Sequence, residues 1–283
     1  MHSQAGGPAS AWLRAVPSEL ALQMTPLRLQ VAIRRRLRWP LPLAGGICCK
    51  GCKRELDPYG DRAAACGMSG RLKLRAGPLE KTWARVAREA GGRVRENVLL
   101  RDTALPGVDP TDGRKIEVAV TGLPIAHGLP VLLDATLISP LHADGTPWPK
   151  AADVPGSSFA RALKHKRDQY PELADTPLLH QVVAATEIGG RLNKQALEFL
   201  DAAAFHRAQQ DPRPLRRQAA RAWRARWITL LAVAAQDAIA ATLVNEGPKL
   251  LDAPHGEAPP AVEVWLDMDG PAGVFSGTVA DAV

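Results

Sequence analysis

Two stretches of the sequence carry residues that could act on a phosphate. Asp134 follows a short apolar run in PVLLDATLISPL (130–141), a pattern typical of a strand that delivers a carboxylate to the edge of a sheet. Further along, KHKRDQYPEL (164–173) places Lys166 and Tyr170 four residues apart, so that they share one face of a helix. A carboxylate, a lysine and basic surroundings indicate a divalent-metal nuclease, in which oxygen ligands hold the metal and positive charge neutralises the phosphate.

Two more carboxylates complete the predicted catalytic set. Glu117 and Asp134 fall on neighbouring predicted strands and could hold one Mg²⁺ ion, with Glu80 on a predicted helix as a third ligand. Lys166, with Tyr170 beside it, would orient the attacking water or stabilise the phosphate charge. Each residue also has a structural explanation, since Glu117 could face solvent and Lys166 could lie on a solvated helix face. Asp134 is harder to explain in this way, because a carboxylate between apolar neighbours needs a partner.

The cysteines are concentrated in one short segment. All four lie between residues 48 and 66, where Cys49, Cys52 and Cys66 form a CxxC pair followed by a third cysteine. A compact cysteine group in a chain that shows no signal peptide indicates a metal site before a disulfide scaffold. Zinc binds four nitrogen or sulfur ligands, and these cysteines supply three, with no histidine between Cys52 and Cys66, so the prediction is a zinc knuckle whose fourth ligand is missing. The alternative is a metal-free loop held by its turn residues.

The charge distribution suggests a polyanionic partner. The chain has 36 Lys and Arg residues against 29 Asp and Glu residues, a formal net charge of +7, and the basic residues are clustered. Arginine binds phosphate through two hydrogen bonds, so DNA, or else RNA, is the expected partner. The alternative is an ordinary basic surface. The predicted nucleic-acid-binding residues are Arg71, Lys73, Arg75, Lys164, Arg167, Arg217, Arg221 and Arg224.

No membrane segment is expected. The most apolar run, residues 228–243, is short and contains Gln236 and Asp237, so it is interpreted as a buried helix.

Apolar periodicity predicts a small α/β core. Three short runs rich in β-branched residues follow a predicted helix, and a helix, a fourth strand and another helix come after them. This order predicts helices packed on a small mixed sheet. The predicted helices cover residues 77–91, 157–170 and 189–210, and the predicted strands cover residues 93–100, 115–122, 130–137 and 178–187.

The core is expected to lie between other segments. The first segment is helical and includes a helix capped by Thr25 with Pro26 in its first turn. The last segment is rich in Pro, Gly and Ala and is predicted to be disordered. The predicted boundaries are 1–46 for the N-terminal helices, 47–70 for the cysteine-rich segment, 71–210 for the core, 211–250 for a basic and apolar helical extension, and 251–283 for the tail.

Several motifs in order resemble a known family. CCKGCKRELDPYGDRAAAC, LEKTWARVAREAG, KIEVAV, LDATLISPL and KRDQYPEL are similar to the C-terminal region of non-LTR retrotransposon polyproteins, in particular to copies from dinoflagellate genomes. In that region a Cys/His knuckle precedes a restriction-endonuclease-like domain of the PD-(D/E)XK type. The resemblance covers residues 10–245, and it implies an endonuclease that nicks DNA with Mg²⁺. We therefore expect an intracellular, nuclear protein.

The resemblance also assigns roles to individual residues. Asp134 matches the acid of the third strand and Glu80 matches the acid of the first helix. Three positions depart from the family pattern. Glu117 replaces an aspartate, and Arg62 replaces the knuckle histidine. DAT, which begins with Asp134, stands where the family has ExK, so that Lys166 would have to supply the lysine. Three functions stay open: a Mg²⁺-dependent endonuclease, a catalytically dead nucleic-acid-binding remnant of such a polyprotein, or a helical interaction protein.

Overall fold

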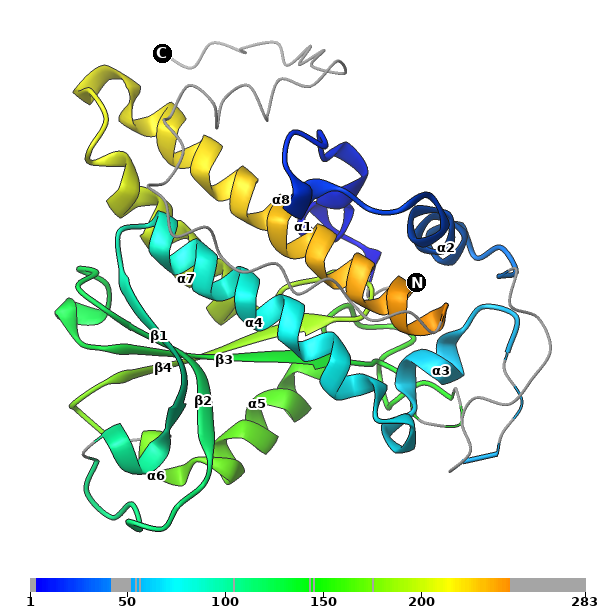
Figure 1. The fold of residues 1–283 in the computed structure, drawn as a ribbon, viewed down its shortest axis with the longest axis horizontal. Coiled ribbons are helices and arrows are strands. Elements are labelled where there is room, and N and C mark those ends of the chain that lie inside the picture. Colours follow the sequence, from blue (N-terminus) through cyan, green and yellow to red (C-terminus); the bar gives the residue numbers. More distant parts are fainter. Residues whose placement is uncertain are drawn as a thin grey trace.

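The computed structural model has a mixed α/β fold in which helices flank a four-stranded sheet (Figure 1). The sheet and its helices all fall within the part of the chain that the structure describes. That part is residues 4–244, except 42–51, 54, 56, 104, 143, 145 and 175.

The strands follow one another across the sheet in chain order, β1-β2-β3-β4. The first three strands are antiparallel neighbours, whereas β4 runs parallel to β3 and is reached through a helical crossover. The small mixed sheet with flanking helices therefore agrees with the predicted fold class. The strands are β1 (Arg93–Leu99), β2 (Lys115–Thr121), β3 (Val131–Ile138) and β4 (His180–Glu187).

The helices form layers on both faces of the sheet. On one face α4 packs on β1, β2 and β3, and α7 packs on β4, while α8 covers α4 and α7 as an outer layer. On the opposite face α5 packs on β3 and β4. The α-helices are α1 (Gly7–Ser10), α2 (Pro26–Leu37), α3 (Asp61–Ala65), α4 (Arg71–Glu89), α5 (Ser158–Gln169), α6 (Pro171–Ala174), α7 (Lys194–Ala208) and α8 (Arg216–Leu243). Short 3₁₀ turns cover Ala11–Arg14, Leu20–Leu22, Gly67–Ser69, Leu100–Thr103, Ala126–Gly128 and Arg213–Leu215.

The largest hydrophobic cluster lies between the sheet and the α4, α7 and α8 layers. Trp83 of α4 is completely buried there together with Val118 and Leu133, which face α4 from β2 and β3. Because successive strand residues point to opposite faces, the neighbours of Val118 and Leu133 must face α5. This alternation decides on which side of the sheet Glu117 and Asp134 lie.

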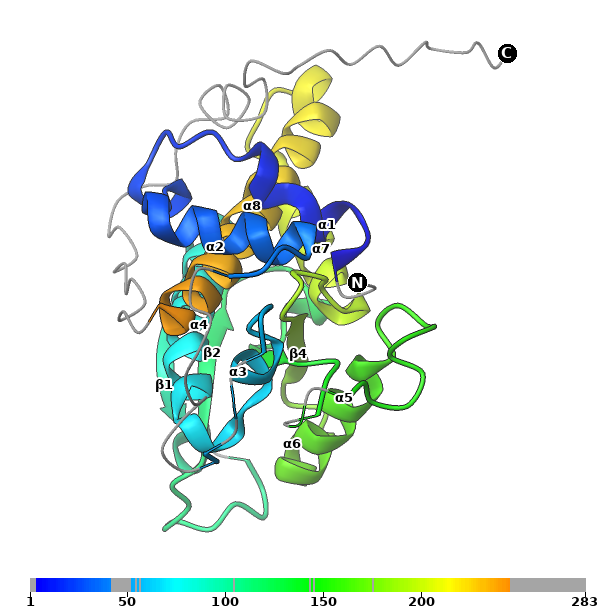
Figure 2. The ribbon, with the colours of Figure 1, turned by 90° about the vertical axis from the view of Figure 1, so that its right-hand side faces the viewer.

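Helix α8 belongs to this core. By length and composition, Arg213–Leu243 could cross a membrane, but 89% of its apolar window is buried inside the fold. This burial agrees with the interpretation of residues 228–243 as a buried helix. The N-terminal elements α1 and α2 lie against α8, on the side away from the sheet (Figure 2).

Two predicted helix boundaries are wrong. Helix α4 begins at Arg71, not near residue 77, and Pro78 lies inside it. The Arg75 guanidinium bonds to the Ala63 and Ala64 carbonyls, so tertiary contacts hold the part of α4 that precedes the proline. Helix α7 begins at Lys194, not at residue 189.

The predicted start of α7 fails for a local reason. Gly190 has φ +93° and forms a turn with Glu187 instead of opening a helix. The helix begins only after Asn193, whose side chain accepts a hydrogen bond from Ala196 N at 3.0 Å. Asn193 is therefore the N-cap, as Thr25 is for α2, where the prediction is confirmed.

Candidate active site

Glu117 and Asp134 face each other from neighbouring strands. Val118 of β2 pairs with Leu133 of β3, so the next position along these antiparallel strands places Glu117 opposite Asp134. Both side chains lie on the face that α5 covers, because they alternate with residues that face α4. The sheet therefore brings two carboxylates together from residues distant in sequence.

Helix α5 supplies the third group. Lys166 Nζ lies 2.7 Å from Asp134 Oδ1 and 4.0 Å from Glu117 Oε1. Ala162, one turn earlier, is buried against Val183 of β4, which fixes the face of α5 that is turned to the sheet. The structure thus brings Glu117, Asp134 and Lys166 together, on the elements that the sequence predicts for them.

The three groups are withdrawn from water. The Asp134 side chain is 0% exposed, that of Lys166 is 12% exposed and that of Glu117 is 18% exposed. Burial first, and then the negative charge of Asp134 and a hydrogen bond to it, raise the pKa of Glu117 to about 8, although Lys166 opposes this shift. At neutral pH Glu117 is therefore mainly protonated.

Apart from the hydrogen bond that the two carboxyl groups share, each keeps one oxygen that receives no hydrogen bond from another group of the described residues. These atoms are Glu117 Oε2 and Asp134 Oδ2, and both are buried. A buried carboxylate oxygen without a donor is costly unless a proton or a cation neutralises it. The pair therefore has the electrostatic character of a cation site, with a proton on Glu117 in place of the cation.

Tyr170 supports Lys166. The Tyr170 hydroxyl donates a hydrogen bond to the Lys115 carbonyl at 2.8 Å and accepts one from the Gln169 amide at 3.0 Å. The Lys166 Nζ lies 5.7 Å from the centre of the Tyr170 ring. Burial and the nearby charges of Asp134 and Glu117 raise the pKa of Tyr170, so it stays neutral. Its contacts fit a positioning residue better than the predicted catalytic one.

Arg114 is a supporting residue that the sequence does not single out. Its guanidinium donates to the Gln169 carbonyl at the end of α5, to Asp112 at 2.6 Å and to Glu172 of α6 at 2.7 Å. These bonds fix the end of α5 to the start of β2, and so help to keep Lys166 over the carboxylates. The close spacing of Asp112 and Arg114 is the only local signal for this role.

Glu80 lies at the margin of the site. It belongs to α4, and burial, together with the charges of Asp134 and Glu96, raises its pKa, whereas Lys166 lowers it. Within the described residues, no group of three or more His, Cys, Asp or Glu side chains is arranged to hold a metal ion. Glu80 therefore interacts electrostatically with Asp134 and Lys166, and its role as a third ligand stays a prediction.

Two carboxylates are nevertheless enough for Mg²⁺ when a substrate phosphate and water complete its octahedron. Glu117 Oε2 and Asp134 Oδ2 are oxygen donors of the kind that Mg²⁺ prefers, and neither is used by another donor group of the described residues. Lys166 engages only the other Asp134 oxygen at hydrogen-bond distance. The residues present therefore fit a Mg²⁺ ion bound together with substrate.

The predicted zinc site is described only in part. Cys49 lies outside the described residues. Cys66 is 1% exposed, and Cys52 packs against the same hydrophobic cluster. Arg62, at the expected histidine position, donates a hydrogen bond to the Glu55 carbonyl at 2.8 Å. Zinc binding stays a prediction, with Cys52 and Cys66 brought to one side of the fold.

The predicted nucleic-acid-binding residues divide by exposure. Arg75 is completely buried and bonds to Thr242 Oγ1 at 2.7 Å as well as to the α3 carbonyls, so it holds α4 to its neighbours and cannot reach a nucleic acid. Arg71 is half-buried, Arg224 pairs with Asp201, and the Lys73 side chain lies outside the described part of the structure. The exposed members are Lys164, Arg167, Arg217 and Arg221.

No protein-family model matches this chain, and no curated protein sequence matches it. Its function therefore has to be inferred from the chemistry of its own residues. The carboxylate pair with Lys166 is the arrangement best suited to bind a cation and act on a phosphate.

Proposed function

We propose that the protein is a restriction-endonuclease-like, Mg²⁺-dependent nuclease that cleaves DNA phosphodiester bonds. One observation carries the proposal: Glu117 and Asp134 meet on neighbouring strands beside the Lys166 ammonium. Each carboxyl group has a buried oxygen to which no other group of the described residues donates a hydrogen bond. Carboxylate oxygens that bind a divalent cation and an ammonium that faces a developing negative charge are what phosphodiester cleavage requires.

The fold supports the same proposal. The order α4, β1, β2, β3, α5 and β4 gives the small mixed sheet with flanking helices that the resemblance to retrotransposon endonuclease domains implies. The polyprotein origin, DNA as the partner and a nuclear location are part of the proposal and rest on this resemblance. The basic surface of α5, with Lys164 and Arg167 exposed, supports a polyanionic substrate.

In this reaction each residue of the site would have a separate role. Mg²⁺ bound by Glu117 and Asp134 would supply charge neutralisation and a more acidic bound water. Glu117 must give up its proton before it can bind a cation. Lys166, held over the pair by α5, presents its ammonium where negative charge develops on the phosphate. Tyr170 and Arg114 keep the end of α5 in place.

Nicking of supercoiled plasmid tests the proposal. The full chain is incubated with the plasmid and Mg²⁺ or Mn²⁺, and the Asp134→Asn and Lys166→Met variants are compared with it. We expect metal-dependent nicking that falls by at least about a hundredfold in each variant, because each loses a group that acts on the reacting phosphate. Glu198→Gln is the matched control, since Glu198 is an exposed carboxylate of α7.

Two outcomes would contradict the proposal, and one control excludes misfolding. Nicking that persists in Asp134→Asn would contradict the proposed site. Nicking that survives EDTA would contradict metal dependence. Circular dichroism and a thermal melt of each variant separate lost chemistry from lost structure.

A second function is a nucleic-acid-binding remnant without catalysis. Two observations favour it. Lys166 is already paired with Asp134, and Thr136 stands where the family pattern has its lysine. A remnant would retain DNA in a gel shift, with affinity that falls steeply with salt, and would not nick plasmid under any metal condition.

A further inference from the structure

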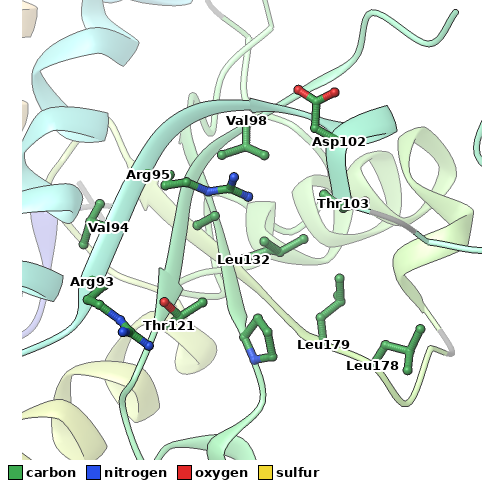
Figure 3. A pocket seen from close by; sticks show the side chains of 12 residues that line it. Arg93, Val94, Arg95, Val98, Asp102, Thr103, Thr121, Leu132, Leu178 and Leu179 are labelled. Carbon is green, nitrogen blue, oxygen red and sulfur yellow. The ribbon is translucent and has the colours of Figure 1, made fainter. Parts of the chain in front are cut away.

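A cavity lies beside the proposed site, on the same face of the sheet. Its volume is about 330 Å³, and Ala119 of β2 forms part of its wall. Leu132 of β3 forms another part of the wall (Figure 3). Ala119 comes two residues after Glu117 on β2, and Leu132 comes two residues before Asp134 on β3. Two strand residues span about 7 Å, so the cavity begins within roughly that distance of the carboxylates along the strands.

The wall of the cavity is mostly apolar. Leu132 and Ala119 pair across β2 and β3, and Leu179 packs with them in one hydrophobic cluster. Val98 closes the cavity from β1. Such a wall fits a flat, weakly polar group better than a phosphate or a sugar.

Two arginines of β1 stand over this apolar wall. Arg93 and Arg95 line the cavity and are exposed, and neither side chain forms an ion pair or hydrogen bond with the described part of the chain. By contrast, Arg88 of α4 is paired with Glu96 at 2.6 Å. Among the described residues, Asp102 is the one acidic residue that lines the cavity; it is more than half exposed and lies 3.8 Å from Arg101. The cavity mouth is therefore electropositive.

We propose that this cavity binds an unpaired nucleotide next to the scissile phosphate of a DNA strand. The base would lie against Ala119, Leu132 and Leu179, and its phosphate would bind Arg93 and Arg95. A nucleotide has both a flat, weakly polar base and an anionic phosphate. The cavity offers an apolar wall for the base and, next to it, two arginines for the phosphate. This inference rests on the proposed nuclease function, because the nuclease site defines which phosphate is cleaved.

The inference names a substrate class. A base in a continuous duplex is stacked and paired, so it can enter the cavity only after it is extruded from the helix, which costs the stacking and pairing it loses. A nucleotide in a gap, a bulge or a frayed end is already free of its partner. DNA with an unpaired nucleotide at the cleavage site is therefore the preferred substrate.

Fluorescence anisotropy tests the preference. Two labelled duplexes of equal length and sequence are compared in Ca²⁺, one fully paired and one with a single-nucleotide bulge, and cleavage of both is then followed in Mg²⁺. We expect the wild type to bind the bulged duplex at least about tenfold more tightly, because only the paired duplex must first extrude a base before the cavity can be filled. Arg95→Ala should reduce the ratio severalfold and lower the salt slope of binding by about one.

Two further variants sharpen the test. Ala119→Leu adds volume to the cavity wall and should abolish the preference while Arg93 and Arg95 remain. Arg14→Ala removes one exposed arginine from a 3₁₀ turn that packs on α8, and it should leave the ratio unchanged. If Ala119→Leu does not fold, the comparison of the bulge preference of Arg95→Ala with that of Arg14→Ala still tests the cavity assignment.

The outcomes separate the two proposals. Nicking with equal binding of paired and bulged DNA would overturn the cavity assignment and leave the nuclease standing. A preference for the bulge that Arg95→Ala removes, without any cleavage, would support the cavity and contradict the nuclease. A preference that Arg95→Ala and Ala119→Leu both leave intact would overturn the cavity assignment, and absence of binding to either duplex would overturn both proposals.

Discussion

At the level of single residues, the site is governed by charge balance among Glu117, Asp134 and Lys166. Two ionised carboxylates and one ammonium would leave a net negative charge in a buried place, which is unfavourable. A proton on Glu117 removes this excess, which is why its pKa rises to about 8. A divalent cation would remove it as well, so protons and metal compete for the same pair.

This proton makes stability depend on pH in metal-free protein. The pKa of Glu117 is raised from 4.5 to about 8 on folding, so between these values the native state binds more protons than the unfolded state. Its contribution to stability is therefore fully present at low pH and is lost as pH rises toward about 8. Urea unfolding of Glu117→Gln in EDTA should show that the variant gains stability relative to wild type from pH 5 to pH 9.

A matched variant isolates the effect. Glu198→Gln removes an exposed carboxylate, so its stability relative to wild type should change little over the same pH range. If Glu117→Gln and Glu198→Gln gave parallel pH profiles, Glu117 would be ionised in the folded protein, and the charge balance described above would be wrong.

Among the elements, the connection from β4 to α7 depends on one side chain. Asn193 is 3% exposed, its Oδ1 accepts from Ala196 N at 3.0 Å, and its Nδ2 donates to the Val183 carbonyl at 2.8 Å. One amide thus caps the helix and satisfies a buried carbonyl of β4. Because Val183 is paired with Asp134, this connection also supports the strand that carries the catalytic carboxylate.

Loss of this side chain should destabilise the protein measurably. In Asn193→Ala the cap is lost, at about 1 kcal/mol, and the Val183 carbonyl loses its donor, at about 1–3 kcal/mol. We expect the free energy of unfolding to fall by about 2–4 kcal/mol in urea denaturation. Gln218→Ala, on an exposed position of α8, is the control and should cost under about 0.5 kcal/mol. Equal losses in both variants would contradict the role of Asn193.

Across the whole molecule, a buried ion network joins three layers. Glu89 of α4 accepts hydrogen bonds from Arg85 at 2.8 Å, from Arg226 of α8 at 3.2 Å and from the Trp227 indole at 2.8 Å. Both arginines also bind Glu19 of the N-terminal segment. The network therefore ties the N-terminal segment and α8 to the helix that covers the sheet.

Neutralising Glu89 at the centre of this network should destabilise the folded protein. Burial by itself would raise the pKa of Glu89, but Arg226, Arg85 and the Trp227 indole together lower it. Its stabilising effect is therefore present above the ordinary glutamate pKa and is lost as pH falls through the lowered value. Glu89→Gln should lose about 3–5 kcal/mol at pH 7, and the gap to wild type should narrow at low pH.

Thermal unfolding at pH 7 and at pH 3 measures this gap, with Glu198→Gln as the control for loss of an exposed carboxylate. A gap of the same size at both pH values would show that the Glu89 charge does not hold the layers together.

The sequence by itself determined the local features of this protein. The alternation around Glu117 and the apolar run before Asp134 place each carboxylate on a strand. The expected helix carries Lys166 in its last turn, and Tyr170 follows as the residue that ends α5. The cap at Thr25 is also local, since it needs only a hydroxyl and a following proline. Such features depend on neighbours within a few residues, so the pattern of residue types is sufficient to predict them.

Only the tertiary structure decided how these features combine. The burial of Arg75 and the extension of α4 beyond Pro78 depend on contacts with α3 and α8. The proton on Glu117 and the cavity beside Leu132 have the same origin. Burial and charge are sums over residues distant in sequence, so they are fixed only when the layers pack.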